Sequence, residues 1–263
     1  MSDEIILPYN LDLGSRRYQR EVLLDDRKNK VLVIHRRAGK TSLALAKVVM
    51  EAIIKPNIYF YACPTQRQAK QVVWMAPDML KKLVPREAVL KTNEVDLVIY
   101  LKNGSQIYIK GADNPDSWRG VNPYGVVLDE YSQMKPEIYD EILLPILLAN
   151  GGWVWFLGTP KGKDHFYDRF NIAQNKKGWQ ALLLPASHSG ILSSAILEEA
   201  RLSMTEQAFS QEFECAWVDG VGVLFRRITE NIKDTLSEPM AGRQYAMGVD
   251  LARIEDWTVI TVL

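Results

Sequence analysis

The sequence has few cysteines and no long apolar run. Cys63 and Cys215 are the only cysteines among 263 residues, too few and too far apart for a disulfide framework or a cysteine-based zinc site. We expect both to be core residues of a protein from a reducing compartment. No apolar run approaches the ~20 residues needed to span a bilayer, and the N-terminus, MSDEIILPYN, lacks the basic segment of a signal peptide. These absences argue against export and against a membrane partner.

A net charge is also lacking. Lys+Arg and Asp+Glu both number 32, so any contact with nucleic acid must come from local patches rather than from a global field. Basic clusters occur at 16–20, 161–163 and 176–177, although such clusters are more often solvated faces. With 47% hydrophobic residues, a chain of this length can bury one large α/β core and supply a small attachment.

The most informative stretch is residues 30–54, KVLVIHRRAGKTSLALAKVVMEAII. Its continuous apolar start predicts a parallel strand buried on both faces, and the spacing after Thr41 predicts a helix. The turn between them, RRAGKT, predicts a phosphate-binding loop. Gly39 allows close backbone approach to phosphate, Lys40 supplies a positive charge for the β- and γ-phosphates, and the Thr41 hydroxyl is a ligand for Mg²⁺.

This loop departs from the usual glycine-rich pattern. Ile34 occupies the place of the first glycine, and Arg36 and Arg37 stand where small residues are common. A bare Gly-Lys-Thr occurs by chance in many chains. The strand before it and the helix after it favour a nucleotide site over an incidental turn.

A short helix is predicted just before this loop, beginning near Ser15. It carries Tyr18 and Gln19. An amide presents a donor and an acceptor that can pair with the adenine edge, and an aromatic ring can cover the base. The alternative is an exposed glutamine on an amphipathic helix.

A second acidic motif follows a predicted buried strand. Gly125-Val126-Val127-Leu128 runs into Asp129 and Glu130, which is typical of a Walker B strand. Asp129 is expected to hold Mg²⁺ and Glu130 to orient and polarise the attacking water. Acids also cap strand ends in general, but two matched halves in this order strengthen each other.

Other segments predict an α/β domain with two additions. We expect a helix at 66–83, and Asn103-Gly104 predicts a type I′ hairpin within 95–109 at the sheet edge. Further strands are expected at 58–63, 153–157 and 179–184, and further helices at 136–148 and 164–173. Helices at 193–204 and 206–213 are expected to form a small lid. Thr159, at a strand end, can hydrogen-bond the γ-phosphate or the attacking water.

The composition changes after residue 218. We predict a P-loop domain with its lid at 1–220, a linker at 221–243, and two strands of a new domain at 244–263. The chain stops on an apolar strand at 258–263, TVITVL, which is a poor terminus for a complete domain. We therefore expect the last segment to be the start of a domain that is cut short.

The ordered motifs RYQ, HRRAGKT, SWRG, VVLDE, GTPKG, FSQEFECAW and MGVDLA resemble the large terminase subunit of tailed bacteriophages, the motor that pumps DNA into the procapsid. The resemblance covers nearly the whole chain. It implies a RecA-like (ASCE) P-loop ATPase with a mainly parallel sheet flanked by helices, followed by an RNase H-like nuclease domain.

The resemblance also implies roles for individual residues. Tyr18 and Gln19 would lie at the adenine, and Thr159 would belong to the coupling motif. Arg119 matches the position proposed as the arginine finger given in trans to a neighbouring subunit, and Asp250 matches the first metal-binding aspartate of the nuclease. The phosphate and magnesium ligands and the catalytic carboxylate would be Arg36, Arg37, Ala38, Gly39, Lys40, Thr41, Ser42, Asp129 and Glu130.

The partners implied are ATP, Mg²⁺, double-stranded DNA, further copies of the chain in a ring, the portal protein and the small terminase subunit, in the host cytoplasm. Asp250 alone cannot hold two metal ions, so nuclease activity is expected only in a longer chain. Two alternatives remain at this stage, a RecA-like helicase or translocase of another system and a P-loop scaffold without turnover. Glu130 argues against the scaffold.

Overall fold

The computed structural model describes residues 16–218, 242, 244, 247–250 and 259–262. The chain divides into two compact units, Met1–Val221 and Gly222–Leu263. Within the described residues, no helix is long and apolar enough to cross a membrane.

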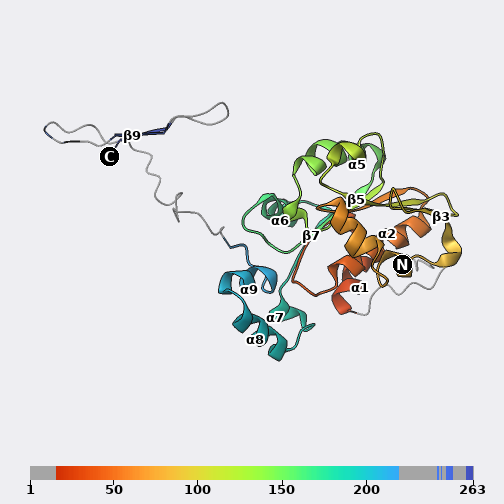
Figure 1. Ribbon diagram of the computed structural model, residues 1–263, viewed down its shortest axis with the longest axis horizontal. Helices are drawn as coiled ribbons and strands as arrows, with labels where there is room; N and C mark the ends of the chain where they lie inside the picture. The colour runs from red at the N-terminus through yellow and green to blue at the C-terminus, as the bar shows by residue number, and fades with distance from the viewer. Residues whose placement is uncertain (1–15, 219–241, 243, 245–246, 251–258, 263) are drawn as a thin grey trace. The chain divides into compact units, whose positions relative to one another are not determined.

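One eight-stranded sheet organises the described part of the first unit, in the order β3-β4-β5-β2-β6-β7-β1-β8 (Figure 1). Strands from β5 to β8 in this order pair in parallel, and β3, β4 and β5 pair antiparallel at one edge. The strands are Asn29–Ile34 (β1), Ile58–Cys63 (β2), Val89–Asn93 (β3), Val98–Leu101 (β4), Gln106–Gly111 (β5), Gly125–Leu128 (β6), Trp153–Gly158 (β7) and Trp179–Leu184 (β8).

Helices cover both faces of this sheet. The α-helices are Arg17–Leu24 (α1), Lys40–Ile54 (α2), Gln66–Gln68 (α3), Leu80–Leu83 (α4), Leu144–Asn150 (α5), His165–Asn175 (α6), Ala186–Ser189 (α7), Ser194–Ser203 (α8) and Glu206–Glu212 (α9). Two π-helices occupy Ala69–Trp74 and Ile138–Leu143, and 3₁₀ turns occupy Arg86–Ala88, Pro115–Trp118 and Tyr131–Gln133.

Alternate side chains of each central strand enter two different cores. Leu32 and Ile34 of β1 pack with the α2 side, whereas Val31 and Val33 pack with the α6 side. Strands buried on both faces read as continuous apolar runs because neither face meets water. The mainly parallel α/β fold predicted from these runs is confirmed, and α8 and α9 are the two predicted lid helices.

The single helix expected at 66–83 is wrong. The chain forms α3 and a π-helix that ends at Trp74, breaks at 75–79, and resumes only in α4. Pro77 lies in this break. Proline has no N–H to donate and disfavours helical geometry in the residue before it, which explains the interruption.

The turn type expected at Asn103-Gly104 is also wrong, although the hairpin itself is present between β4 and β5. A type I′ turn needs positive φ at both central residues, and here Gly104 has φ of 95° while Asn103 is not among the residues with positive φ. The Asn103 side chain donates to the Ala52 carbonyl and accepts from the Ser105 N–H. These contacts fix a longer loop that is anchored on α2.

In the second unit, Met247–Asp250 (β9) and Val259–Val262 (β10) form a two-stranded antiparallel sheet in which Val259 lies opposite Asp250. The two strands predicted for this segment are present. The linker predicted at 221–243 lies almost wholly outside the described residues.

Candidate active site

The predicted site residues meet at the carboxyl ends of the parallel strands. The loop after β1 carries Lys40, the end of β6 carries Asp129 and Glu130, and the end of β7 carries Thr159. Ligands of open α/β sheets bind at this edge. A cavity of about 340 Å³ opens there, lined by Arg36, Thr41, Cys63, Pro64, Gln68, Val72, Asp129, Glu130, Gln133, Thr159, Lys161 and Glu212.

The loop delivers Lys40 to the start of a long helix. Gly39 has φ of 85° and precedes α2, whose 15 residues begin with Lys40. The Lys40 side chain is 9% exposed, and its Nζ lies 3.0 Å from the Ile34 carbonyl oxygen and 3.9 Å from Glu130 Oε1. The unpaired N–H groups of a helix N-terminus favour an anion, and Lys40 adds a full charge beside them.

Asp129 is held by two hydroxyl groups. Thr41 Oγ1 donates to Asp129 Oδ2 over 3.2 Å, and the Tyr61 hydroxyl donates to the same oxygen. Burial raises the pKa of Tyr61 well above its usual range, so the hydroxyl stays protonated and available as a donor. The Thr41 and Asp129 oxygens are hard ligands, and one or two protein oxygens that share the ion with phosphates and waters suit Mg²⁺.

Glu130 combines an unusual backbone with a perturbed carboxyl group. Its φ of 56° lies in the left-handed region, which is uncommon outside glycine and is associated with functional sites. Burial, together with the charges of Asp129 and Glu212, raises the pKa of Glu130, although Lys40 and Lys161 oppose the shift. A carboxyl group of raised pKa beside a lysine is suited to accept a proton.

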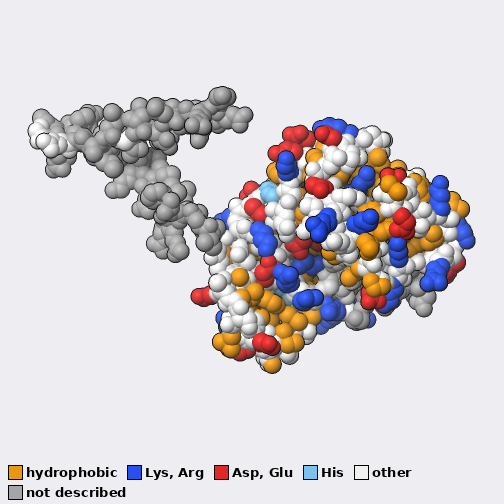
Figure 2. Space-filling model, viewed as in Figure 1, with side chains coloured by type: hydrophobic (Ala, Val, Ile, Leu, Met, Phe, Trp, Pro, Cys, Tyr) orange, Lys and Arg blue, Asp and Glu red, His pale blue; other side chains and the backbone are white. Residues whose placement is uncertain are grey.

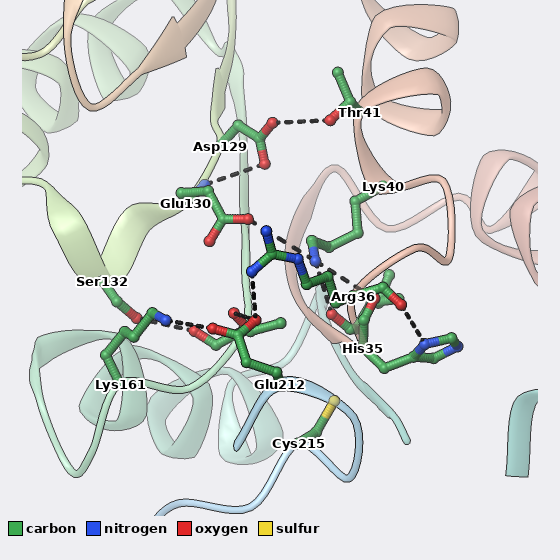
Figure 3. Close-up of polar contacts among 12 residues, drawn as sticks. His35, Arg36, Lys40, Thr41, Asp129, Glu130, Ser132, Lys161, Glu212 and Cys215 are labelled. Atoms are coloured by element: carbon green, nitrogen blue, oxygen red, sulfur yellow. Dashed lines mark hydrogen bonds and ion pairs between the residues drawn. The ribbon is translucent and has the colours of Figure 1, made fainter. Parts of the chain in front are cut away.

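Glu212, the last residue of α9, joins three polar groups at the cavity (Figure 3). Its carboxylate accepts a hydrogen bond from Thr159 Oγ1 over 3.3 Å and pairs with Lys161 and, at 3.7 Å, with Arg36 Nη1. Although burial opposes the shift, the hydrogen bond from Lys161 and the charges of Lys161 and Arg36 lower the pKa of Glu212. The lid therefore places an anion among cationic and hydroxyl groups of the cavity.

Tyr18 and Gln19 lie against the phosphate loop. The Tyr18 hydroxyl donates to the Ala38 carbonyl oxygen over 2.6 Å, and Gln19 Nε2 donates to that of Gly39 over 3.0 Å. Gln19 is buried. The adenine contact expected for both residues stays a prediction.

Other predicted residues lie outside the cavity lining. Arg119 is exposed after the 3₁₀ turn Pro115–Trp118 and pairs with Asp116 at 3.1 Å. Arg37 is exposed in the loop, with φ of 68°, and Ser42 lies in the first turn of α2. Asp250 ends β9 in the second unit, and its metal-binding role stays a prediction. In the described parts of the chain, no group of three or more His, Cys, Asp or Glu side chains is arranged to hold a metal ion.

Sequence reasoning missed Tyr61 and Glu212. Tyr61 lies in an aromatic strand, IYFYAC, where nothing distinguishes it from Tyr59, and its role depends on the neighbouring strand β6. Glu212 belongs to FSQEFECAW, which supported the family resemblance without suggesting a role for this carboxylate. Its acidic residue near the end of a predicted lid helix was the available signal.

The sheet order, the loop before α2 and the acidic pair after β6 define a P-loop fold of the ASCE class. A family model described as "Terminase large subunit, T4likevirus-type, N-terminal" matches residues 31–232. The chain belongs to this family.

Two curated relatives are the large terminase subunits of Thermus virus P23-45 and Thermus phage G20c. Each is 22% identical to the chain over 286 aligned positions, which cover 90% of the chain and 57% of the relative. The chain thus spans about half the length of the curated relatives it matches.

Two solved structures share the fold. The large terminase ATPase domain of Thermus phage P74-26 has a TM-score of 0.69 at 21% identity, covering 78% of this chain and 94% of that one. The large terminase of a thermophilic bacteriophage, solved in complex with ADP, has a TM-score of 0.63 at 18% identity, covering 95% and 64%.

Proposed function

We propose that the chain is the ATP-hydrolysing motor part of a large terminase subunit, which drives double-stranded DNA into a viral procapsid. The observation that carries this proposal is the placement of Lys40, Asp129 and Glu130 around one cavity at the start of α2. A nucleotide scaffold without turnover has no use for Glu130 beside the metal ligand. Support for ATP comes from the large terminase of the thermophilic bacteriophage, which was solved with ADP and with ATP-gamma-S.

The phosphates are bound by the loop 36–42, with Lys40 exchanging the Ile34 carbonyl for a phosphate oxygen. Glu130 then orients a water molecule and accepts its proton as the water attacks the γ-phosphorus. Thr41 and Asp129 are the side chains that would hold Mg²⁺. When bound, the ion would neutralise charge on the β- and γ-phosphates.

Thr159 reports the state of the γ-phosphate to the lid. Its hydroxyl lies in the cavity lining and donates to Glu212 of α9. An anionic γ-phosphate competes with the Glu212 carboxylate for Thr159, Lys161 and Arg36, because like charges repel at this distance. Nucleotide binding and release thus change what holds the lid.

Arg119 serves a neighbouring subunit in a ring of identical copies. Its side chain is 62% exposed, outside the cavity lining of its own chain, in a loop that also contains Gly120 with φ of 83°. An arginine fork that is always charged suits transition-state stabilisation across such an interface. The portal protein and the small terminase subunit are the further partners in this proposal, with the host cytoplasm and the procapsid portal as its location.

The proposed domain organisation has the ATPase with its lid at 1–220, a linker at 221–243, and the start of an RNase H-like nuclease, with Asp250 as a metal ligand, at 244–263. Support comes from the two compact units, which divide at Val221.

Steady-state ATP hydrolysis, measured with and without double-stranded DNA and at several protein concentrations, tests the function. We expect Mg²⁺-dependent hydrolysis that DNA stimulates. Binding of ATP without hydrolysis would indicate a scaffold, and ATP-driven strand separation of a duplex would indicate a helicase.

A further inference from the structure

Four consecutive carbonyl oxygens of the phosphate loop each accept a hydrogen bond from a side chain. Three donors come from α1 or its first flanking residue, and the fourth is the histidine that follows β1. The pairs are His35 Nδ1 with Arg36 O at 2.7 Å, Arg16 Nη1 with Arg37 O at 3.2 Å, Tyr18 Oη with Ala38 O at 2.6 Å, and Gln19 Nε2 with Gly39 O at 3.0 Å.

These contacts determine the direction of the loop amides. In a planar trans peptide, the C=O of one residue and the N–H of the next point to opposite sides. Carbonyl groups that are held toward the four side chains therefore direct the N–H groups of residues 37–40 the other way. No hydrogen bond within the described part of the chain uses these four N–H groups. A row of free backbone N–H groups is an anion-binding arrangement.

We propose that Arg16, Tyr18, Gln19 and His35 form a clamp that presets the phosphate loop. This loop needs outside support because it lacks the first glycine and carries Arg37 in the left-handed region, with φ of 68°, at a cost of roughly 1–2 kcal/mol. The clamp lies directly on the loop. A Cβ atom at Gly39 would come within 2.9 Å of both Arg16 Nη1 and Gln19 Nε2.

The protonation of the clamp residues agrees with these directions. A carbonyl oxygen only accepts, so His35 Nδ1 carries the proton, and its Nε2, 2.9 Å from Ser189 Oγ, accepts from that hydroxyl. Burial lowers the pKa of His35, which keeps the ring neutral. Burial also raises the pKa of Tyr18 to about 12, so its hydroxyl remains a donor.

The clamp acts on the phosphate tail and does not read the base. Gln19 is 4% exposed, and both ends of its carboxamide are in use, because Nε2 donates to Gly39 and Oε1 accepts from the Arg16 N–H at 3.4 Å. Tyr18 and Gln19 are thus positioning residues that act through the loop amides. This inference rests on the proposed function, since it concerns how the same site binds its triphosphate.

The test compares ligands with and without a base. Binding of ATP, GTP and inorganic tripolyphosphate, each with Mg²⁺, is measured by calorimetry on the full chain and on Tyr18→Phe and Gln19→Glu. Each substitution removes one donor and little volume. The loss of one hydrogen bond is expected to weaken ATP and tripolyphosphate by the same factor, about 3- to 10-fold, and to leave the ATP-to-GTP ratio unchanged.

Arg17→Ala is the matched control, because Arg17 lies in the same helix but is 91% exposed and pairs with Glu21; it is expected to change neither ligand. Tyr18→Phe or Gln19→Glu that weakens ATP but spares tripolyphosphate, or that alters the ATP-to-GTP ratio, would overturn the clamp in favour of base contact. Unchanged binding in both variants would overturn it as well. A parent chain that binds no ATP at all contradicts the proposed function itself.

Discussion

Glu130 is the single side chain on which turnover depends most directly in the proposed reaction. Glu130→Gln keeps the shape of the side chain but cannot accept the proton of the attacking water. We expect ATP affinity close to that of the parent and a fall in kcat of about 10²-fold or more, the usual range for a general base. Single-turnover hydrolysis and equilibrium binding measure the two quantities separately. Turnover at the parent rate would remove Glu130 from the catalytic role.

The pH dependence of kcat provides a second test of the same carboxyl group. Burial and the neighbouring charges of Asp129 and Glu212 raise the pKa of Glu130, and only the carboxylate form accepts a proton. Activity should therefore fall on the acid side at a higher pH than an ordinary glutamate would give. Glu212→Gln removes one of the charges that raise this pKa, so the acid limb should move to lower pH. Glu198→Gln, on the outer helix α8, should leave the limb in place.

The sequence alone was sufficient for residues whose role follows from the local chain. Gly39, Lys40 and Thr41 lie between a strand and a helix, and Asp129 and Glu130 end a strand, so their positions follow from the sheet rule. Tyr61 and Glu212 depend on contacts with segments 68 and 53 residues distant. No local pattern specifies such contacts.

At the scale of elements, α9 is the piece that the cavity holds most directly. Its last residue, Glu212, places a negative charge where an anionic ligand is proposed to bind. Two unit charges ~10 Å apart repel by about 1.7 kcal/mol at an effective dielectric constant of ~20, before screening. Glu212→Gln should therefore tighten ATP binding by up to roughly tenfold, with Glu198→Gln as the unchanged control. A weaker or equal affinity in Glu212→Gln would contradict this electrostatic competition.

The elements themselves were predicted well where burial dominates and less well where one residue decides. The central strands are apolar throughout, so their existence followed from composition. The break near Pro77 and the loop at Asn103 depend on a missing N–H and on side-chain contacts with α2. The hairpin was thus predicted with the wrong turn, and one predicted helix proved to be three short helical pieces.

At the scale of the whole molecule, proposed activity depends on assembly, because Arg119 lies outside the cavity of its own chain. An arginine finger contributes about 10³ to 10⁵ in kcat in phosphoryl transfer, so a dilute monomer should be nearly inactive. Specific activity should rise with protein concentration and rise again when DNA collects subunits.

Mixing two inactive variants tests the same prediction. A Glu130→Ala subunit still lends its Arg119, and an Arg119→Ala subunit still offers an intact cavity, so together they should recover part of the activity. Arg86→Ala, another exposed arginine, is the control and should behave as the parent. Full activity of Arg119→Ala alone, or an inactive mixture where the parent assembles, would place the finger elsewhere.

The lid is thinly packed by comparison with the sheet that carries it. None of the residues of α8 is buried, α9 buries only Phe209, and apolar side chains such as Ile196 and Leu202 are 50% and 80% exposed; Figure 2 shows apolar side chains gathered over this region. Every residue of β6 and β7 is buried. Opening of α8 and α9 should therefore require much less free energy than global unfolding. In hydrogen–deuterium exchange, the amides of the two helices should exchange orders of magnitude faster than those of β6 and β7, and their rates should change with the bound nucleotide. Equal protection of lid and sheet would show that the lid unfolds only with the whole unit.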